Sequence, residues 1–181
     1  MTAPAPAGDD PRGVAPDVTA MRRAKRPKSV VAGPFGHPFH AVAVTIPIGA
    51  WSAGLVFDLI SFFVPDPEPY VVGARVLVVI GIVGAIAASV LGFLDFLTLA
   101  KGTRARRTAL AHMTCNTAAL VLFVVSAALR FATPSEVNVA AFVIGVVAFA
   151  GVGVSGWLGG ELAYRFGVRV ADESVQVEAF R

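Results

Sequence analysis

The stretch VVGARVLVVIGIVGAIAASVLGFLDFLTLA, residues 71–100, decides the fold of this chain. Its charged residues are Arg75 and Asp95, so the nineteen residues between them carry no charge and are mostly apolar. A helix of about 20 apolar residues crosses the ~30 Å hydrocarbon core of a bilayer. We therefore expect a membrane-spanning helix in this stretch.

Three further apolar runs have the same character. The predicted spans cover residues 39–64, 71–100, 109–131 and 137–158. Of the 181 residues 56% are hydrophobic and 15% are charged, whereas soluble domains have about 45–50% and about 25%. Short loops make consecutive helices antiparallel neighbours. The expected fold class is all-α, an integral-membrane four-helix bundle in up-down-up-down order.

The chain divides into three parts. Residues 37–160 form the predicted four-helix membrane domain. Residues 1–36 are rich in proline, alanine and basic residues, which predicts a disordered cytoplasmic tail. Residues 161–181 are polar and of mixed charge, and we expect a cytoplasmic C-terminal tail.

Basic residues determine the expected topology. They cluster before the first span and in the loop between the second and third spans. Because such residues stay on the cytoplasmic side, both termini are predicted to be cytoplasmic. The clusters lack interleaved aromatic residues, so the lipid bilayer is the expected partner and nucleic acid is not. The single cysteine, Cys115, excludes an internal disulfide.

Polar residues inside the spans face the interior of a bundle, because their exposure to lipid is costly. His40, Asp95, His112 and Asn116 all lie near the predicted cytoplasmic ends of their spans. We expect them to meet there. In the simplest interpretation they form a hydrogen-bond network in which Asp95 orients a histidine and fixes the helix register.

Two further interpretations of this group stay open. Neutral imidazoles of His40 and His112 on facing helices are suited to bind haem iron, and His37, His40, Asp95 and His112 together are candidate ligands of a metal ion. An intramembrane Asp–His pair is also suited to proton or ion movement. The sequence leaves the cofactor unknown, with none the leading expectation and haem b or a metal ion the alternatives.

A second polar group lies at the opposite ends of the spans. It contains Asp58, Arg75 and Arg130. A charge pair of Asp58 with Arg75 or Arg130 would spare each of them an unpaired charge near lipid, so we interpret these residues as structural. Pro47 lies inside the first span and predicts a kink there.

Four motifs in order resemble those of an uncharacterised bacterial membrane family, domain of unknown function 2231. They are Gly36-His37-Pro38-Phe39-His40, Gly92-Phe93-Leu94-Asp95-Phe96, Ala111-His112 with Asn116, and Gly156-Trp157-Leu158-Gly159-Gly160-Glu161-Leu162-Ala163-Tyr164-Arg165. The resemblance covers about Gly36 to Asp172. It implies a four-helix protein of the bacterial plasma membrane, sometimes joined to or beside redox domains. Phe166 departs from the family, whose closing motif often has histidine there.

The function predicted from the sequence is that of a multi-pass membrane protein of unknown specific role. No catalytic residue is proposed, and the chain is not expected to be an enzyme. A b-type haem or metal-binding redox protein is the first alternative, and a small proton- or ion-coupled transport component is the second. A membrane redox partner and a homo-oligomer are the protein partners considered.

Overall fold

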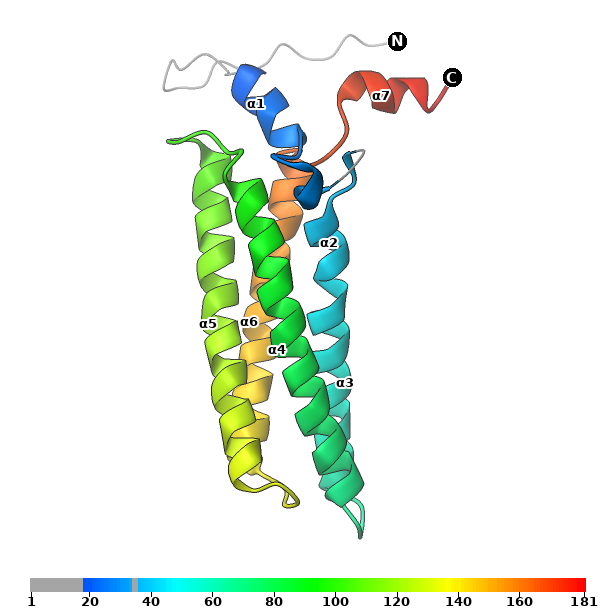
Figure 1. The fold of residues 1–181 in the computed structure, drawn as a ribbon, viewed down its shortest axis with the longest axis vertical. Helices are drawn as coiled ribbons and strands as arrows, with labels where there is room; N and C mark the ends of the chain where they lie inside the picture. The colour runs from blue at the N-terminus through cyan, green and yellow to red at the C-terminus, as the bar shows by residue number, and fades with distance from the viewer. Residues whose placement is uncertain (1–17, 34–35) are drawn as a thin grey trace.

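The computed structural model describes residues 18–33 and 36–181, so most of the predicted N-terminal tail lies outside the described residues. Four long helical segments run along the long axis of the molecule, and consecutive segments are joined at alternating ends (Figure 1). The described residues form helices and loops without strands. The predicted all-α class is confirmed.

The helices have the following bounds. The short elements α1 (Val18–Lys25) and η1 (Val30–Ala32) precede the bundle, which consists of α2 (Phe39–Ala43), α3 (Thr45–Ser61), α4 (Glu68–Phe96), α5 (Arg104–Ala132) and α6 (Val139–Gly160). A π-helical turn, η3 (Glu161–Arg165), continues α6, and α7 (Glu173–Glu178) follows. Four segments are long and apolar enough to cross a membrane: Phe39–Ser61, Glu68–Phe96, Arg104–Ala132 and Val139–Arg165.

The helix limits follow from local chemistry. Pro47 cannot donate a hydrogen bond to the carbonyl four residues earlier, at Ala43. The first span is accordingly interrupted at Val44, between α2 and α3. The side chain of Thr103 accepts a hydrogen bond from the backbone N–H of Arg106 and caps α5, so this helix begins five residues before the predicted span. Asn138 caps α6 in the same way.

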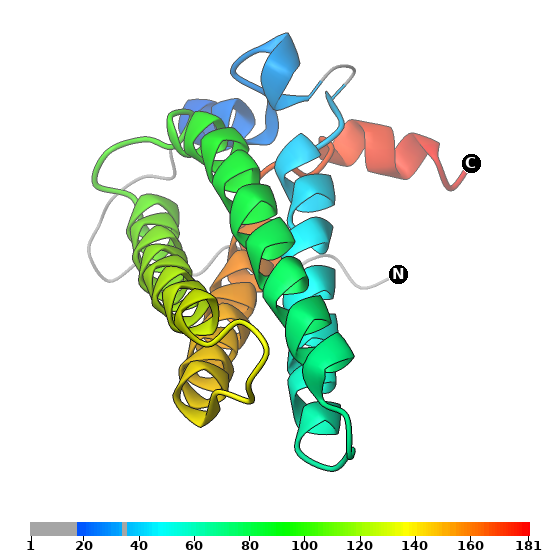
Figure 2. The same ribbon diagram turned by 60° about the horizontal axis from the view of Figure 1, so that its bottom comes forward.

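The bundle consists of two helical hairpins. Helix α3 packs chiefly on α4, and α5 packs chiefly on α6, with fewer contacts between the two pairs. Figure 2 shows the two pairs side by side. The contact between them is centred on Trp51 and Phe123, whose stacked rings have centroids 3.8 Å apart. This stack, with Val78, Ala127 and Ala148, forms the core.

Most of the helical surface faces outward and is apolar. Only 22–28% of an 18-residue apolar stretch in each candidate span is buried inside the bundle. Large apolar side chains such as Val83, Val121 and Val147 are more than half exposed. A soluble protein rarely exposes so much contiguous apolar surface, which here is suited to lipid. The chain is a multi-pass membrane protein that contacts the bilayer.

Candidate functional site

Two histidines meet between the hairpins, near the end of the bundle where α1, the loop 97–103 and α7 lie. We call this the α1 end (Figure 1). His40 is on α2, which packs on α4, and His112 is on α5. The centroids of the two imidazole rings are 6.3 Å apart and their planes are at 89°. Each hairpin therefore contributes one ring to the site.

Backbone carbonyls of neighbouring helices orient both rings. Nδ1 of His40 lies 2.9 Å from the carbonyl oxygen of Ala88, and Nδ1 of His112 lies 2.8 Å from that of Ser155. A carbonyl oxygen only accepts hydrogen bonds, so both Nδ1 atoms carry the proton in these contacts. In the neutral imidazole Nε2 then has the lone pair. Asn116 contacts Nε2 of His112 at 3.1 Å, whereas the described residues provide no hydrogen bond to Nε2 of His40.

Glycines leave the space that the rings occupy. A Cβ atom on Gly92 would lie 2.9 Å from Cε1 of His40. A Cβ atom on Gly159 would lie 3.3 Å from Cε1 of His112. Any larger residue at Gly92 would displace the His40 ring, so the absence of a side chain at this position is part of the site.

Asp95 does not orient a histidine through a hydrogen bond in the part of the chain that the structure describes. Its Oδ1 atom lies 3.0 Å from Nε of Arg169, and both side chains are almost fully buried. The N–H is not aligned for a hydrogen bond, so the contact is an ion pair. Asp95 also lies close enough to His40 for an electrostatic interaction between the two side chains.

Arg169 connects three segments at the α1 end. Its Nη2 atom donates to the carbonyl oxygens of Ala32 and His37, each at 3.2 Å, and its backbone N–H donates to that of Ala24. The residue has φ of 61°, a left-handed conformation that is uncommon outside glycine. These contacts hold the C-terminal segment against both the N-terminal segment and the buried Asp95.

The four predicted metal ligands do not form one cluster. His37 is exposed, and its backbone carbonyl accepts a hydrogen bond from Arg169. Asp95 is paired with the same arginine. Among residues 18–33 and 36–181, no group of three or more His, Cys, Asp or Glu side chains is arranged to hold a metal ion. The histidine pair is what the structure assembles from this set.

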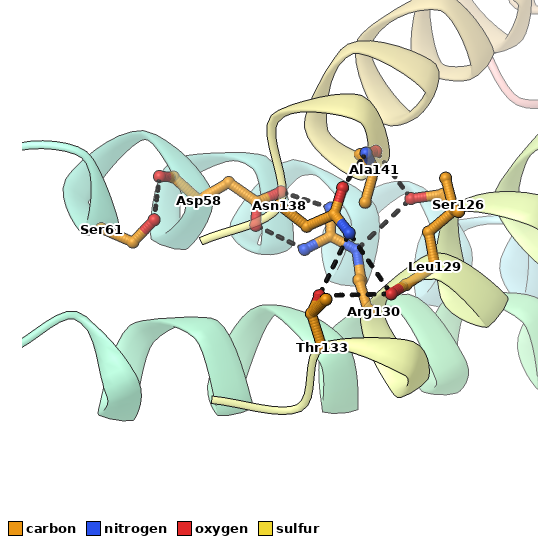
Figure 3. A network of polar contacts seen from close by, with 8 residues as sticks. All are labelled: Asp58, Ser61, Ser126, Leu129, Arg130, Thr133, Asn138 and Ala141. Atoms are coloured by element: carbon orange, nitrogen blue, oxygen red, sulfur yellow. Dashed lines mark hydrogen bonds and ion pairs between the residues drawn. The ribbon is translucent and has the colours of Figure 1, made fainter. Parts of the chain in front are cut away.

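The second polar group forms a buried network at the opposite end of the bundle (Figure 3). Arg130 contacts both carboxylate oxygens of Asp58, with Nη2 2.6 Å from Oδ2, and its Nε donates to Ser126 at 3.3 Å. Arg75 is not part of this network. Its Nη1 donates to the carbonyl of Pro134 at 2.8 Å. Of the two arginines considered as partners of Asp58, the fold selects Arg130.

The family described as "Predicted membrane protein (DUF2231)" matches residues 36–172 of the chain. The match covers more than half of the 181 residues. The chain belongs to this family. No curated protein and no solved structure matches the chain.

In this DUF2231 protein the four motifs meet around the histidine pair. Gly92 of the second motif lies against His40 of the first. Gly159 of the fourth motif lies against His112 of the third. The resemblance predicted from the sequence is confirmed, and the motifs correspond to contacts between helices in each hairpin.

Sequence reasoning missed Arg169. The residue follows the spans by several positions, and in a tail of mixed charge a single arginine gives no signal of burial. One available signal was the charge of Asp95, because a carboxylate inside a span calls for a cation. Ser155 is buried on α6, and its carbonyl contact with His112 depends on the tertiary structure.

Proposed function

We propose that this membrane protein binds a b-type haem between its hairpins, which His40 and His112 would hold, and that the bound haem would let it transfer electrons. The observation that carries the proposal is the pair of facing imidazole rings with centroids 6.3 Å apart. Metal–imidazole bonds of about 2 Å on each side place the centres of two collinear rings roughly 6 Å apart. The observed centroid separation of 6.3 Å is of this size.

The protonation of the rings supports the same conclusion. Metal-bound histidine usually donates its other ring N–H to a carbonyl or carboxylate, which fixes the tautomer. Here Nδ1 of each histidine already donates to a carbonyl, at Ala88 and at Ser155. Each ring therefore keeps an Nε2 lone pair that can serve as a metal ligand, and the one on His112 is contacted by Asn116.

The number of ligands favours haem over a bare metal ion. A structural metal ion needs about four ligands from the protein, and the described residues bring no three candidate side chains together. Haem iron receives four nitrogens from the porphyrin and needs only axial ligands from the protein. Two histidines from separate hairpins are sufficient for haem and insufficient for a closed metal site.

Two groups determine access to the iron position. The side chain of Asn116 lies 3.1 Å from Nε2 of His112 and must turn away before a metal binds there. Gly92 and Gly159 keep the ring faces free of side chains. The hairpins contact each other less extensively than the helices within each hairpin do, so the histidine pair lies at the smaller helix interface of the bundle.

When bound, haem supplies one-electron oxidation and reduction. The chain's residues hold the rings, fix their tautomers and keep the site inside the bundle. We further propose that the α1 end faces the bacterial cytoplasm, because the basic residues of α1, Lys101 and the arginines of the first turn of α5 lie there. A membrane redox partner would then approach this end.

The test uses the full-length protein purified from a host supplied with iron and haem precursor. We expect an intense Soret band and a haem-to-protein ratio near one. His40→Ala and His112→Ala should each abolish stoichiometric binding. His37→Ala is the matched control, because His37 is exposed and lies outside the pair; this variant should bind haem normally.

Two spectroscopic and binding results refine the test. Rings at 89° to each other predict a strongly anisotropic low-spin electron paramagnetic resonance signal from the ferric protein. Asn116→Ala should bind haemin more tightly, because it removes the group that competes for Nε2 of His112. A colourless preparation that fails to take up haemin, or binding that the His37 variant loses as completely as the His40 variant, would refute the proposal.

A further inference from the structure

An open basic cavity of about 570 Å³ lies at the α1 end, and neither histidine of the pair lines it. Its lining comes from α1, from the residues that follow it, and from the end of α4: Thr19, Arg22, Arg23, Arg26, Pro27, Lys28, Leu97 and Thr98. Four of these residues are cationic and none is acidic. We call this cavity the basic pocket.

The position of the pocket relative to the membrane follows from the spans. Helix α4 is one of the four membrane-spanning candidates and ends at Phe96. Leu97 and Thr98, at the margin of the pocket, are the next two residues. The pocket therefore lies where a spanning helix leaves the hydrocarbon, which is the level of lipid headgroups.

The pocket is held in shape by a specific contact. Nε of Arg23 donates to the backbone carbonyl of Thr98 at 2.9 Å, which ties α1 to the end of α4. Ala24, on the next position of α1, is buried against the bundle in a cluster with Phe96 and Leu99. Because α1 is anchored in this way, its neighbouring arginines are presented together and not on a free tail.

Within the part of the chain that the structure describes, the cations of the pocket have little compensation. No ion pair to Arg22, Arg26 or Lys28 is present among the described residues, and all three are exposed. Glu173 binds Lys25 at 2.8 Å and interacts electrostatically with Arg22, but it does not line the pocket. The site is therefore suited to an anion.

We propose that the basic pocket binds the phosphate headgroup of an anionic phospholipid from the adjacent leaflet. Arginine guanidinium groups bind phosphate oxygens with two parallel hydrogen bonds, and the three arginines and Lys28 surround the volume. Leu97, which is 39% exposed at the margin of the pocket, provides an apolar contact for the glycerol and the first acyl carbons. The lipid would hold α1 and the loop 97–103 at the membrane surface.

A free phosphate shares the chemistry of the headgroup, so the experiment must separate the two sources. The full-length protein is purified in a neutral detergent and offered phosphatidylglycerol, phosphatidylcholine, glycerol phosphate or inorganic phosphate. Bound species are counted by native mass spectrometry. We expect one phosphatidylglycerol molecule to be retained in preference to phosphatidylcholine, and neither soluble phosphate to displace it at millimolar concentration.

The variant Arg22→Gln/Arg26→Gln/Lys28→Gln removes three pocket cations and leaves the Arg23 anchor in place. Each cation near an anionic lipid surface contributes roughly a fivefold change in affinity, so retention should fall at least tenfold. The matched control is Lys101→Gln/Arg104→Gln/Arg107→Gln, which removes the same charge from the same end outside the pocket. It should retain the lipid. The single variant Arg26→Gln provides a milder loss should the triple variant prove unstable.

Three results would overturn the proposal. Equal losses in the two triple variants would mean that net charge, and not the pocket, retains the lipid. Equal retention of phosphatidylglycerol and phosphatidylcholine would show that the phosphate charge is not recognised. Complete displacement by inorganic phosphate or glycerol phosphate would assign the pocket to a soluble anion.

Discussion

Nε of Arg169 lies 3.0 Å from Oδ1 of Asp95, and this ion pair joins the C-terminal segment to the buried end of α4. The exposed fractions of the two side chains are 6% and 11%. The same arginine binds the carbonyl of His37, three residues before His40. The pair therefore supports the histidine site without being part of it.

Removal of one member of this pair should cost more than removal of both. Asp95→Leu or Arg169→Leu alone leaves an unpaired buried charge, which costs about 3–5 kcal/mol. The double variant Asp95→Leu/Arg169→Leu should recover a large part of that loss. The measurement is the free energy of unfolding in detergent for the wild-type protein, the two single variants and the double variant. Strict additivity of the two single losses would contradict the pairing.

The Asp58–Arg130 pair should contribute strongly, whereas Arg75 should not. Arg130→Met leaves Asp58 buried without a partner and should lower the free energy of unfolding by about 3–5 kcal/mol. Arg75→Met is the matched control, because Arg75 donates to a carbonyl in an exposed contact; its loss should be below about 1 kcal/mol. Similar losses in the two variants would contradict the network in Figure 3.

The glycine beside His40 should tolerate no side chain. A methyl group at Gly92 would lie 2.9 Å from the His40 ring, and overpacking of this kind costs about 1–3 kcal/mol. Gly92→Ala should lower both thermal stability and haem binding. Gly153→Ala is the control, because a Cβ atom there would meet nothing within 4 Å. A Gly92→Ala protein that matches the control in both measurements would show that the His40 ring is not confined there.

The contact between α1 and α7 should depend on pH. The hydrogen bond from Lys25 lowers the pKa of Glu173 below its ordinary value. A depressed carboxyl pKa gives a contribution that is present at neutral pH and is lost as the pH falls through the pKa of the folded state. α7 should therefore detach as the pH falls below the usual range of carboxyl groups.

A spin label at position 177 in a Cys115→Ser background measures this detachment, because Val177 lies on the exposed surface of α7. In the protein that keeps Glu173 and Lys25, the mobility of the label should rise on acidification. In a Glu173→Gln background the label should already be mobile at neutral pH and should change little with acid. A pH response that persists unchanged in the glutamine variant would assign the effect to another group.

The sequence by itself determined the membrane character, the all-α class and the interior faces of the helices. Runs of apolar residues as long as a bilayer is thick have few alternatives to a spanning helix. The cost of polar groups in lipid then identifies which residues turn inward, including His40, His112, Asp58 and Arg130. These inferences depend on local composition and helical period, which the sequence displays directly.

Only the tertiary structure decided which polar groups are partners. Asp95 pairs with Arg169 from a distant tail, and Arg130 was selected over Arg75 for Asp58. Ion pairs and hydrogen bonds depend on separations of a few ångströms between helices, whereas helical periodicity specifies only a face. The carbonyls that fix the histidine tautomers belong to Ala88 and Ser155, and a backbone group carries no sequence signal at all.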